Sequence, residues 1–136
     1  MAEAQKRIER PLSPHLQIYR WPLTMLLSIL HRMSGVAAGL GTLLLTWWLI
    51  ATVMGPQAYE QVQICMGSVL GRLILFGFSL SLIFHTLNGV RHLVWDVGRG
   101  FEIRNATLSG WLVVVLTFIL TAVAWAYGLR MWGGEL

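Results

Sequence analysis

The chain has 136 residues, of which 56% are hydrophobic and only 12% are charged, and its mean hydropathy is +0.64. A soluble domain carries about 25% charged residues, so this composition excludes an ordinary soluble domain and indicates a membrane protein. The formal net charge is +4, but the basic residues form no continuous tract, so nucleic acid is not an expected partner.

Residues 1–28 are predicted to form a cytoplasmic N-terminal segment. Acidic and basic residues are interleaved near its start, and prolines interrupt the stretch that follows. This pattern does not match a secretory signal peptide, and the acidic residues argue against a mitochondrial transit peptide. It favours the bacterial inner membrane over the mitochondrial inner membrane, which is the alternative for an already processed chain.

Three apolar stretches are long enough to cross a bilayer as helices, which takes about 20 residues. These transmembrane helices are predicted at 29–54, 69–93 and 108–129. The pair Gly55-Pro56 is expected to end the first helix. Asn105 or Thr107 is the expected N-cap of the third. The predicted fold class is all-α, a membrane protein with three transmembrane helices.

Positive charge is distributed unevenly between the two ends of the predicted bundle. Only Arg72 and Arg130 lie near one end, whereas the other lysines and arginines lie toward the N-terminus, at the start of the first helix or around the second connection. The positive-inside rule therefore places the N-terminus inside and the C-terminus outside.

Three helices are few for a self-contained transporter or enzyme core. Gly35-x-x-x-Gly39 and Gly67-x-x-x-Gly71 have the spacing that lets a neighbouring helix approach closely. We therefore expect the chain to form part of a hetero-oligomeric helix bundle. The alternative is that these glycines only relieve packing inside the chain.

Two polar segments interrupt the apolar pattern, S-I-L-H-R at 28–32 and H-T-L-N-G-V-R-H-L-V-W-D at 85–96. Together they hold three of the four histidines. Ionisable groups at the edge of a hydrocarbon layer are costly to keep, so they indicate function. Two such segments on separate helices suggest one shared site.

Ser28 and Arg32 are four residues apart and share one face of a helix. A hydroxyl beside a guanidinium suits a carbonyl or an anionic oxygen. The alternative is an arginine that snorkels to the interface while Ser28 caps the helix. His31 points about 100° away from Arg32 around the helix and can serve a different ligand. Its alternative is an interfacial histidine bonded to water or a carbonyl.

His85 lies deep in the second predicted helix, where a neutral imidazole needs a hydrogen-bond partner or a metal. Gly89 follows at i+4 and leaves an open patch where a flat macrocycle can approach. A b-type haem held by imidazole requires no cysteine, which agrees with the single cysteine, Cys65. The alternative is a packing histidine whose hydrogen bonds are satisfied within the protein.

His92 lies two turns after His85, about 10 Å along the helix, so the two cannot ligate one metal. His92 and Arg91 are expected to meet haem propionates, with a solvated helix end as the alternative. Asp96 is a candidate proton relay, and a salt bridge at the helix end is the alternative.

Together with R-P-L-S-P-H-L-Q-I-Y-R at 10–20, these segments resemble the cytochrome b subunit of succinate dehydrogenase, the larger membrane anchor of respiratory complex II. The resemblance covers nearly the whole chain in motif order, length and helix count. It implies that Ser28 and Arg32 line the ubiquinone pocket and that His85 is an axial ligand of the iron of one haem b. It also implies that His31 lies near the haem propionates, and it leaves the roles of His92 and Asp96 unassigned.

The same resemblance implies three protein partners and a lipid environment. The second haem ligand is expected from a second small membrane anchor, and the quinone pocket from an iron–sulfur subunit. A flavoprotein subunit oxidises succinate. Alternatives are the anchor of a fumarate reductase that oxidises quinol, a haem-free structural anchor, and a small transporter. A transporter of this size requires an acidic residue inside a span, and the sequence has none there.

Overall fold

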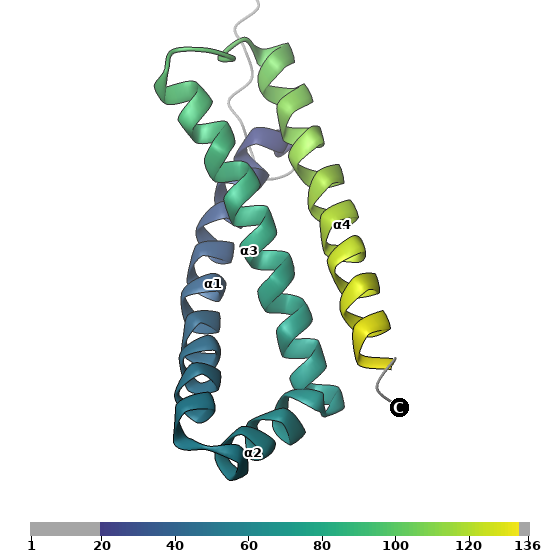
Figure 1. The fold of residues 1–136 in the computed structure, drawn as a ribbon. Coiled ribbons are helices and arrows are strands. Elements are labelled where there is room, and N and C mark those ends of the chain that lie inside the picture. Colours follow the sequence, from purple (N-terminus) through teal and green to yellow (C-terminus); the bar gives the residue numbers. More distant parts are fainter. Residues whose placement is uncertain (1–19, 134–136) are drawn as a thin grey trace, which may run out of the picture.

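The computed structural model describes residues 20–133, which form four α-helices. In chain order these are α1 (Leu23–Met54), α2 (Pro56–Gly67), α3 (Val69–Asp96) and α4 (Ile103–Gly133). Most of the predicted N-terminal segment and of the 10–20 motif lies outside the described residues. α3 runs antiparallel to both α1 and α4 and lies between them, while α2 crosses one end (Figure 1).

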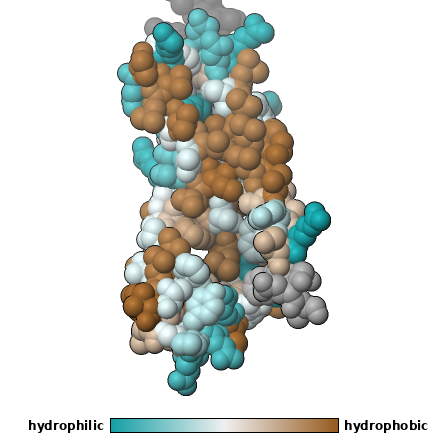
Figure 2. Space-filling view, in the orientation of Figure 1, coloured by the Kyte–Doolittle hydropathy of each residue, from teal (hydrophilic) through white to brown (hydrophobic). Residues whose placement is uncertain are grey.

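Three of the helices, α1, α3 and α4, are long and apolar enough to span a membrane. Much of their outer surface is hydrophobic, as at Val36, Leu43 and Val123, which are each more than half exposed. Figure 2 shows hydrophobic residues over the middle of the bundle and hydrophilic ones gathered toward its ends. The predicted all-α fold with three transmembrane helices is confirmed.

α1 begins ahead of the predicted start at residue 29. Pro22 has an extended backbone and acts as the N-cap, and its carbonyl accepts hydrogen bonds from the amides of Met25 (3.1 Å) and Leu26 (3.2 Å). A proline suits this boundary because it has no N–H to donate. Ser28 therefore lies inside the helix, and the interpretation of Ser28 as a helix cap is wrong.

α4 also begins earlier than predicted, at Ile103. The expected caps lie inside its first turns. The amide of Asn105 donates to Glu102 Oε2 at 3.1 Å, and the hydroxyl of Thr107 donates to the carbonyl of Ile103 at 2.8 Å. The N-cap prediction for α4 is wrong because the short polar side chains bond locally within a helix that has already started.

α2 fills a stretch for which the sequence predicted no helix. Gly55 turns the chain between α1 and α2 with φ +112°, a conformation that L side chains rarely adopt, and Pro56 occupies the first turn of α2. Ser68 then caps α3 by accepting a hydrogen bond from the amide of Gly71 at 3.0 Å. A Cβ at Gly71 would overlap the carbonyl of Cys65, so this glycine serves a turn within the chain.

A buried arginine joins α3 to α4. Arg91 donates from Nε to Ser109 Oγ (3.0 Å), from Nη1 to Asn88 Oδ1 (3.2 Å) and from Nη2 to the carbonyl of Ala106 (2.8 Å). Its guanidinium also lies 4.0 Å from the ring centroid of Trp95. Asn88 and Arg91 are almost fully buried, at 0% and 6% exposure, so these bonds satisfy groups that are costly to leave unpaired.

We expect Arg91→Met to destabilise the α3–α4 contact, because it leaves Asn88 Oδ1 and the Ala106 carbonyl without this donor. Loss of a charged hydrogen bond costs about 1.5–3 kcal/mol. The midpoint of thermal unfolding in detergent should fall for Arg91→Met and stay near the wild-type value for Arg99→Met, whose parent side chain is exposed. Equal midpoints for the two variants would contradict the assigned role of Arg91.

Candidate functional site

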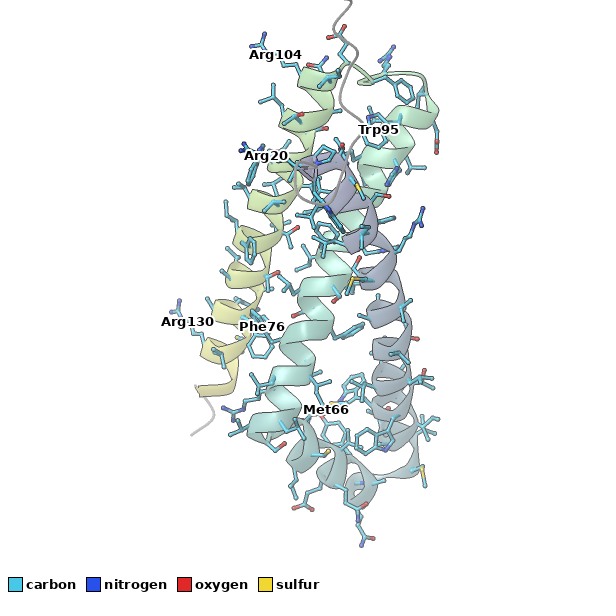
Figure 3. The ribbon with its side chains drawn as sticks, turned by 180° about the vertical axis from the view of Figure 1, so that it is seen from behind. Arg20, Met66, Phe76, Trp95, Arg104 and Arg130 are labelled. Atoms are coloured by element: carbon cyan, nitrogen blue, oxygen red, sulfur yellow. The ribbon has the colours of Figure 1, made fainter. Side chains whose placement is uncertain are left out.

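The two polar segments meet at one end of the bundle. α1 starts and α3 finishes at the end where Arg20, Trp95 and Arg104 are labelled in Figure 3, whereas Arg130 and Met66 lie toward the other end. There the rings of His31 and His85 are stacked, with centroids 4.0 Å apart and planes 7° from parallel. The expectation that both segments contribute to one region of the protein is confirmed.

His85 is held from α1 through its Nδ1 atom. Nδ1 lies 3.1 Å from the backbone carbonyl oxygen of His31 and 3.3 Å from Ser34 Oγ. A carbonyl oxygen can only accept a hydrogen bond, so the proton of a neutral His85 ring belongs on Nδ1. Nε2 then carries the free lone pair that an imidazole offers to a metal.

Glycine at position 35 allows this contact. A Cβ there would lie 2.9 Å from His85 Cε1, which is closer than real Cβ atoms approach. Gly39, one turn further along α1, has no such neighbour within 4 Å in the described part of the chain. Gly35 thus serves packing inside the chain, and the open face at Gly39 is the one available to another helix.

His31 lies between the other two histidines of the site. Its ring centroid is 5.0 Å from that of His92, which in turn lies 5.1 Å from Trp95. His31 Nδ1 is buried and has no hydrogen-bond partner among residues 20–133. Buried polar atoms are seldom left unpaired in folded proteins, so this nitrogen is an exception among the described residues. A Cβ added at Gly89 would lie 4.0 Å from His31 Cε1.

Ser28 and Arg32 lie on the same helix as His31 but differ in exposure. Ser28 is partly buried and Arg32 is exposed, although both belong to a helix that can span a membrane. His31 faces α3, as its stacking on His85 shows. His31 and its neighbour Arg32 therefore point in different directions, whereas Ser28, three residues before His31, lies on the same side of the helix as His31. The exposed guanidinium calls for a partner outside this chain.

The remaining predicted residues lie further from the histidine stack or face elsewhere. Arg91 is buried against α4, so the interpretation of its side chain as a solvated helix end is wrong, and we leave it out of the ligand contacts proposed below. His92 has Asn88 Nδ2 3.5 Å from its Nε2. Asp96 is exposed at the last residue of α3.

Ser34 is a site residue that the sequence analysis did not select. It is 8% exposed, and its hydroxyl donates to the His31 carbonyl at 2.9 Å while facing His85. The available signal was its position at i+3 from His31, which puts both side chains on one face of the helix. Ser34 also borders a mostly apolar cavity of about 370 Å³ between α1, α3 and α4, together with Ser81 and Thr117.

Membrane-length helices, a partly buried histidine stack and an exposed arginine beside it define a helical membrane subunit with a polar ligand site near one end. Residues 6–124 match the family model described as the succinate dehydrogenase/fumarate reductase transmembrane subunit, and the chain belongs to that family.

Curated relatives agree with this assignment. The succinate dehydrogenase cytochrome b556 subunit of Rickettsia typhi is 41% identical over 117 residues, covering 86% of this chain and 91% of its own. That of Paracoccus denitrificans is 42% identical over 117 residues, covering 86% and 90%. The mitochondrial cytochrome b560 subunit of Sus scrofa is 40% identical over 122 residues, covering 86% and 70%.

We expect Gly35→Ala to destabilise the α1–α3 contact, because the added methyl group displaces the His85 ring. Overpacking of this kind costs roughly 1–3 kcal/mol. Gly39→Ala adds the same methyl group on the same helix where the chain leaves room. Thermal unfolding of the purified complex should show a lower midpoint for Gly35→Ala than for Gly39→Ala. The reverse order would show that the partner-facing glycine is the critical one.

Proposed function

We propose that the chain is the membrane-anchor subunit of a succinate dehydrogenase, that it ligates a haem b through His85 and that it forms part of the ubiquinone-reduction site through Ser28 and Arg32. The observation that carries the proposal is the His85 imidazole, whose Nδ1 faces two oxygen atoms of α1 and whose Nε2 is thereby the metal-binding nitrogen. The relatives that match along most of the chain are named as cytochrome b subunits of succinate dehydrogenase.

The donor set of this chain fits a haem that is shared with another subunit. His85 would supply one ligand to the haem iron, and His31, stacked on it, would lie near the haem propionates, which as carboxylates can accept a hydrogen bond from its ring. His92 extends the same row of rings toward the end of α3. Because His31 is stacked on His85 rather than set opposite to it, we assign the second axial ligand to a second small membrane anchor. Bound there, the haem supplies one-electron storage.

Ser28 and Arg32 would hold ubiquinone as the substrate at the surface of α1. Their donors suit a quinone carbonyl, and Arg32 stabilises the negative charge that develops there as electrons arrive. The exposure of Arg32 on this chain is consistent with a pocket completed by the iron–sulfur subunit. Asp96, exposed at the end of α3, is placed to pass protons from the aqueous phase toward this end of the bundle.

The chain itself makes and breaks no bond in the succinate reaction. A flavoprotein subunit oxidises succinate, and the iron–sulfur subunit passes the electrons to quinone. The charge distribution assigns this end of the bundle to the inner surface, with the N-terminus inside and the C-terminus outside. The bacterial relatives favour the bacterial inner membrane as its location.

The alternative functions can be compared by how well the observations support each of them. The family model covers fumarate reductases as well, but the relatives reported above are succinate dehydrogenase subunits, which favours quinone reduction. Membership of this family removes the transporter alternative. An absorption spectrum of the purified complex distinguishes a haem-binding anchor from a haem-free one.

We expect His85→Ala to abolish the reduced α-band of the b-type haem in the purified complex, because the variant lacks the ligating imidazole. Thr86→Ala is the matched control: Thr86 is the next residue of α3, is exposed and bonds to its own helix at Leu82. Haem is measured per complex by its pyridine haemochrome. A normal α-band in His85→Ala would overturn the ligand assignment.

We expect Arg32→Ala and Ser28→Ala to slow quinone reduction while haem content stays normal. Loss of a charged hydrogen bond of about 1.5–3 kcal/mol corresponds to a fall of roughly 10- to 100-fold in kcat/KM for ubiquinone with Arg32→Ala. Arg99→Ala removes an exposed arginine near the same end and serves as the control. Parallel loss of haem and of subunit assembly in Arg32→Ala would indicate a structural role instead.

A further inference from the structure

We infer that Ser34 is a positioning residue that helps to hold the orientation of His85 and, by accepting from its Nδ1 proton beside the His31 carbonyl, raises how strongly this imidazole donates to the haem iron. The inference rests on the haem ligation proposed above and goes beyond it, because Ser34 acts through His85 and does not touch the haem in our assignment. Three features of the structure support it: the direction of the hydrogen bonds, the burial of Ser34 and the packing of His31 and Gly35 of α1 against the His85 ring.

The direction of the hydrogen bonds follows from the acceptors. Ser34 Oγ donates its single proton to the His31 carbonyl at 2.9 Å. Toward His85 Nδ1, 3.3 Å away, the same oxygen can then only accept. The Nδ1 proton is thus shared between two acceptors, the Ser34 hydroxyl and the His31 carbonyl, and no arrangement with the proton on Nε2 satisfies both contacts.

The burial of Ser34 protects these hydrogen bonds from competition by water. Ser34 is 8% exposed, so water does not readily replace its hydroxyl as the partner of Nδ1. The ring is also held laterally, with His31 stacked on one face at 4.0 Å and Gly35 against its edge. In a site of low dielectric constant each of these polar contacts is stronger than it would be in water.

The consequence for a bound metal is electronic. An acceptor on the Nδ1 proton increases the basicity of the opposite nitrogen, and a more basic axial ligand stabilises the oxidised iron. Removing the Ser34 acceptor leaves the His31 carbonyl in place, so His85 keeps its tautomer but donates less strongly. We therefore expect the haem midpoint potential to rise, with haem content largely retained.

The test uses the purified complex with Ser34→Ala, Ser34→Thr and Ser81→Ala. Ser34→Thr keeps the hydroxyl, and the cavity that Ser34 borders has room for the added methyl group. Ser81→Ala is the matched control, a serine of α3 that borders the same cavity and forms no hydrogen bond with His85 among the described residues. The measurements are haem content, a redox titration of the haem, and the g-values of the oxidised haem by electron paramagnetic resonance.

We expect an upward shift of potential and altered g-values in Ser34→Ala, a return toward wild type in Ser34→Thr, and no shift in Ser81→Ala. If Ser34→Ala fails to assemble, Ser34→Cys replaces it, because a thiol is a weak acceptor of similar size and should give the same upward shift. A potential and g-values in Ser34→Ala, or in its replacement, equal to those of the wild type would overturn the inference.

The two proposals fail separately. Retention of the haem band in His85→Ala would overturn the ligand assignment itself and with it the role of Ser34. Loss of the band in His85→Ala together with an unchanged potential in Ser34→Ala would leave the haem ligand standing and remove only the positioning role.

Discussion

The close approach of α1 and α3 at Gly35 and His85 is the contact on which the rest of the site depends. An imidazole in a span needs partners for its ring nitrogens, and here α1 provides them because position 35 carries no side chain. The same approach stacks His31 on His85 and turns it away from Arg32. The missing methyl group at position 35 thus leaves room for the His85 ring to reach the acceptors of α1 and to stack on His31.

Much of the fold could be predicted from the sequence because a bilayer leaves few choices. A long apolar stretch with satisfied backbone groups has to be a helix, and the three spans follow from that requirement. The boundaries were less predictable, since hydropathy marks where lipid contact ends and not where a helix starts. Pro22 starts α1 within a more polar stretch, and Pro56 starts α2 where the sequence predicted only a connection.

The candidate site could be predicted in its residue types but not in its pairings. Helical spacing correctly predicted that His31 and Arg32 point in different directions, because the angle between two residues of one helix follows from their positions in the sequence. It could not show that His85 lies against the carbonyl of His31, since that contact depends on the relative register of two antiparallel helices. For the same reason Arg91 was assigned to solvent or haem, whereas α4 supplies the acceptors that bury it.

The arrangement divides the site between two sides of one helix. His31 faces inward toward α3 and its neighbour Arg32 is exposed, so α1 presents a histidine to α3 and a guanidinium about 100° away around the helix. In the proposed function, residues that adjoin in sequence thereby serve two different ligands. In that proposal each side is incomplete in this chain, because His85 would offer one nitrogen to the haem iron and Arg32 is exposed. Such a subunit would function through its contacts with other chains. The packing within the chain would hold His85 and Arg32 where those contacts form.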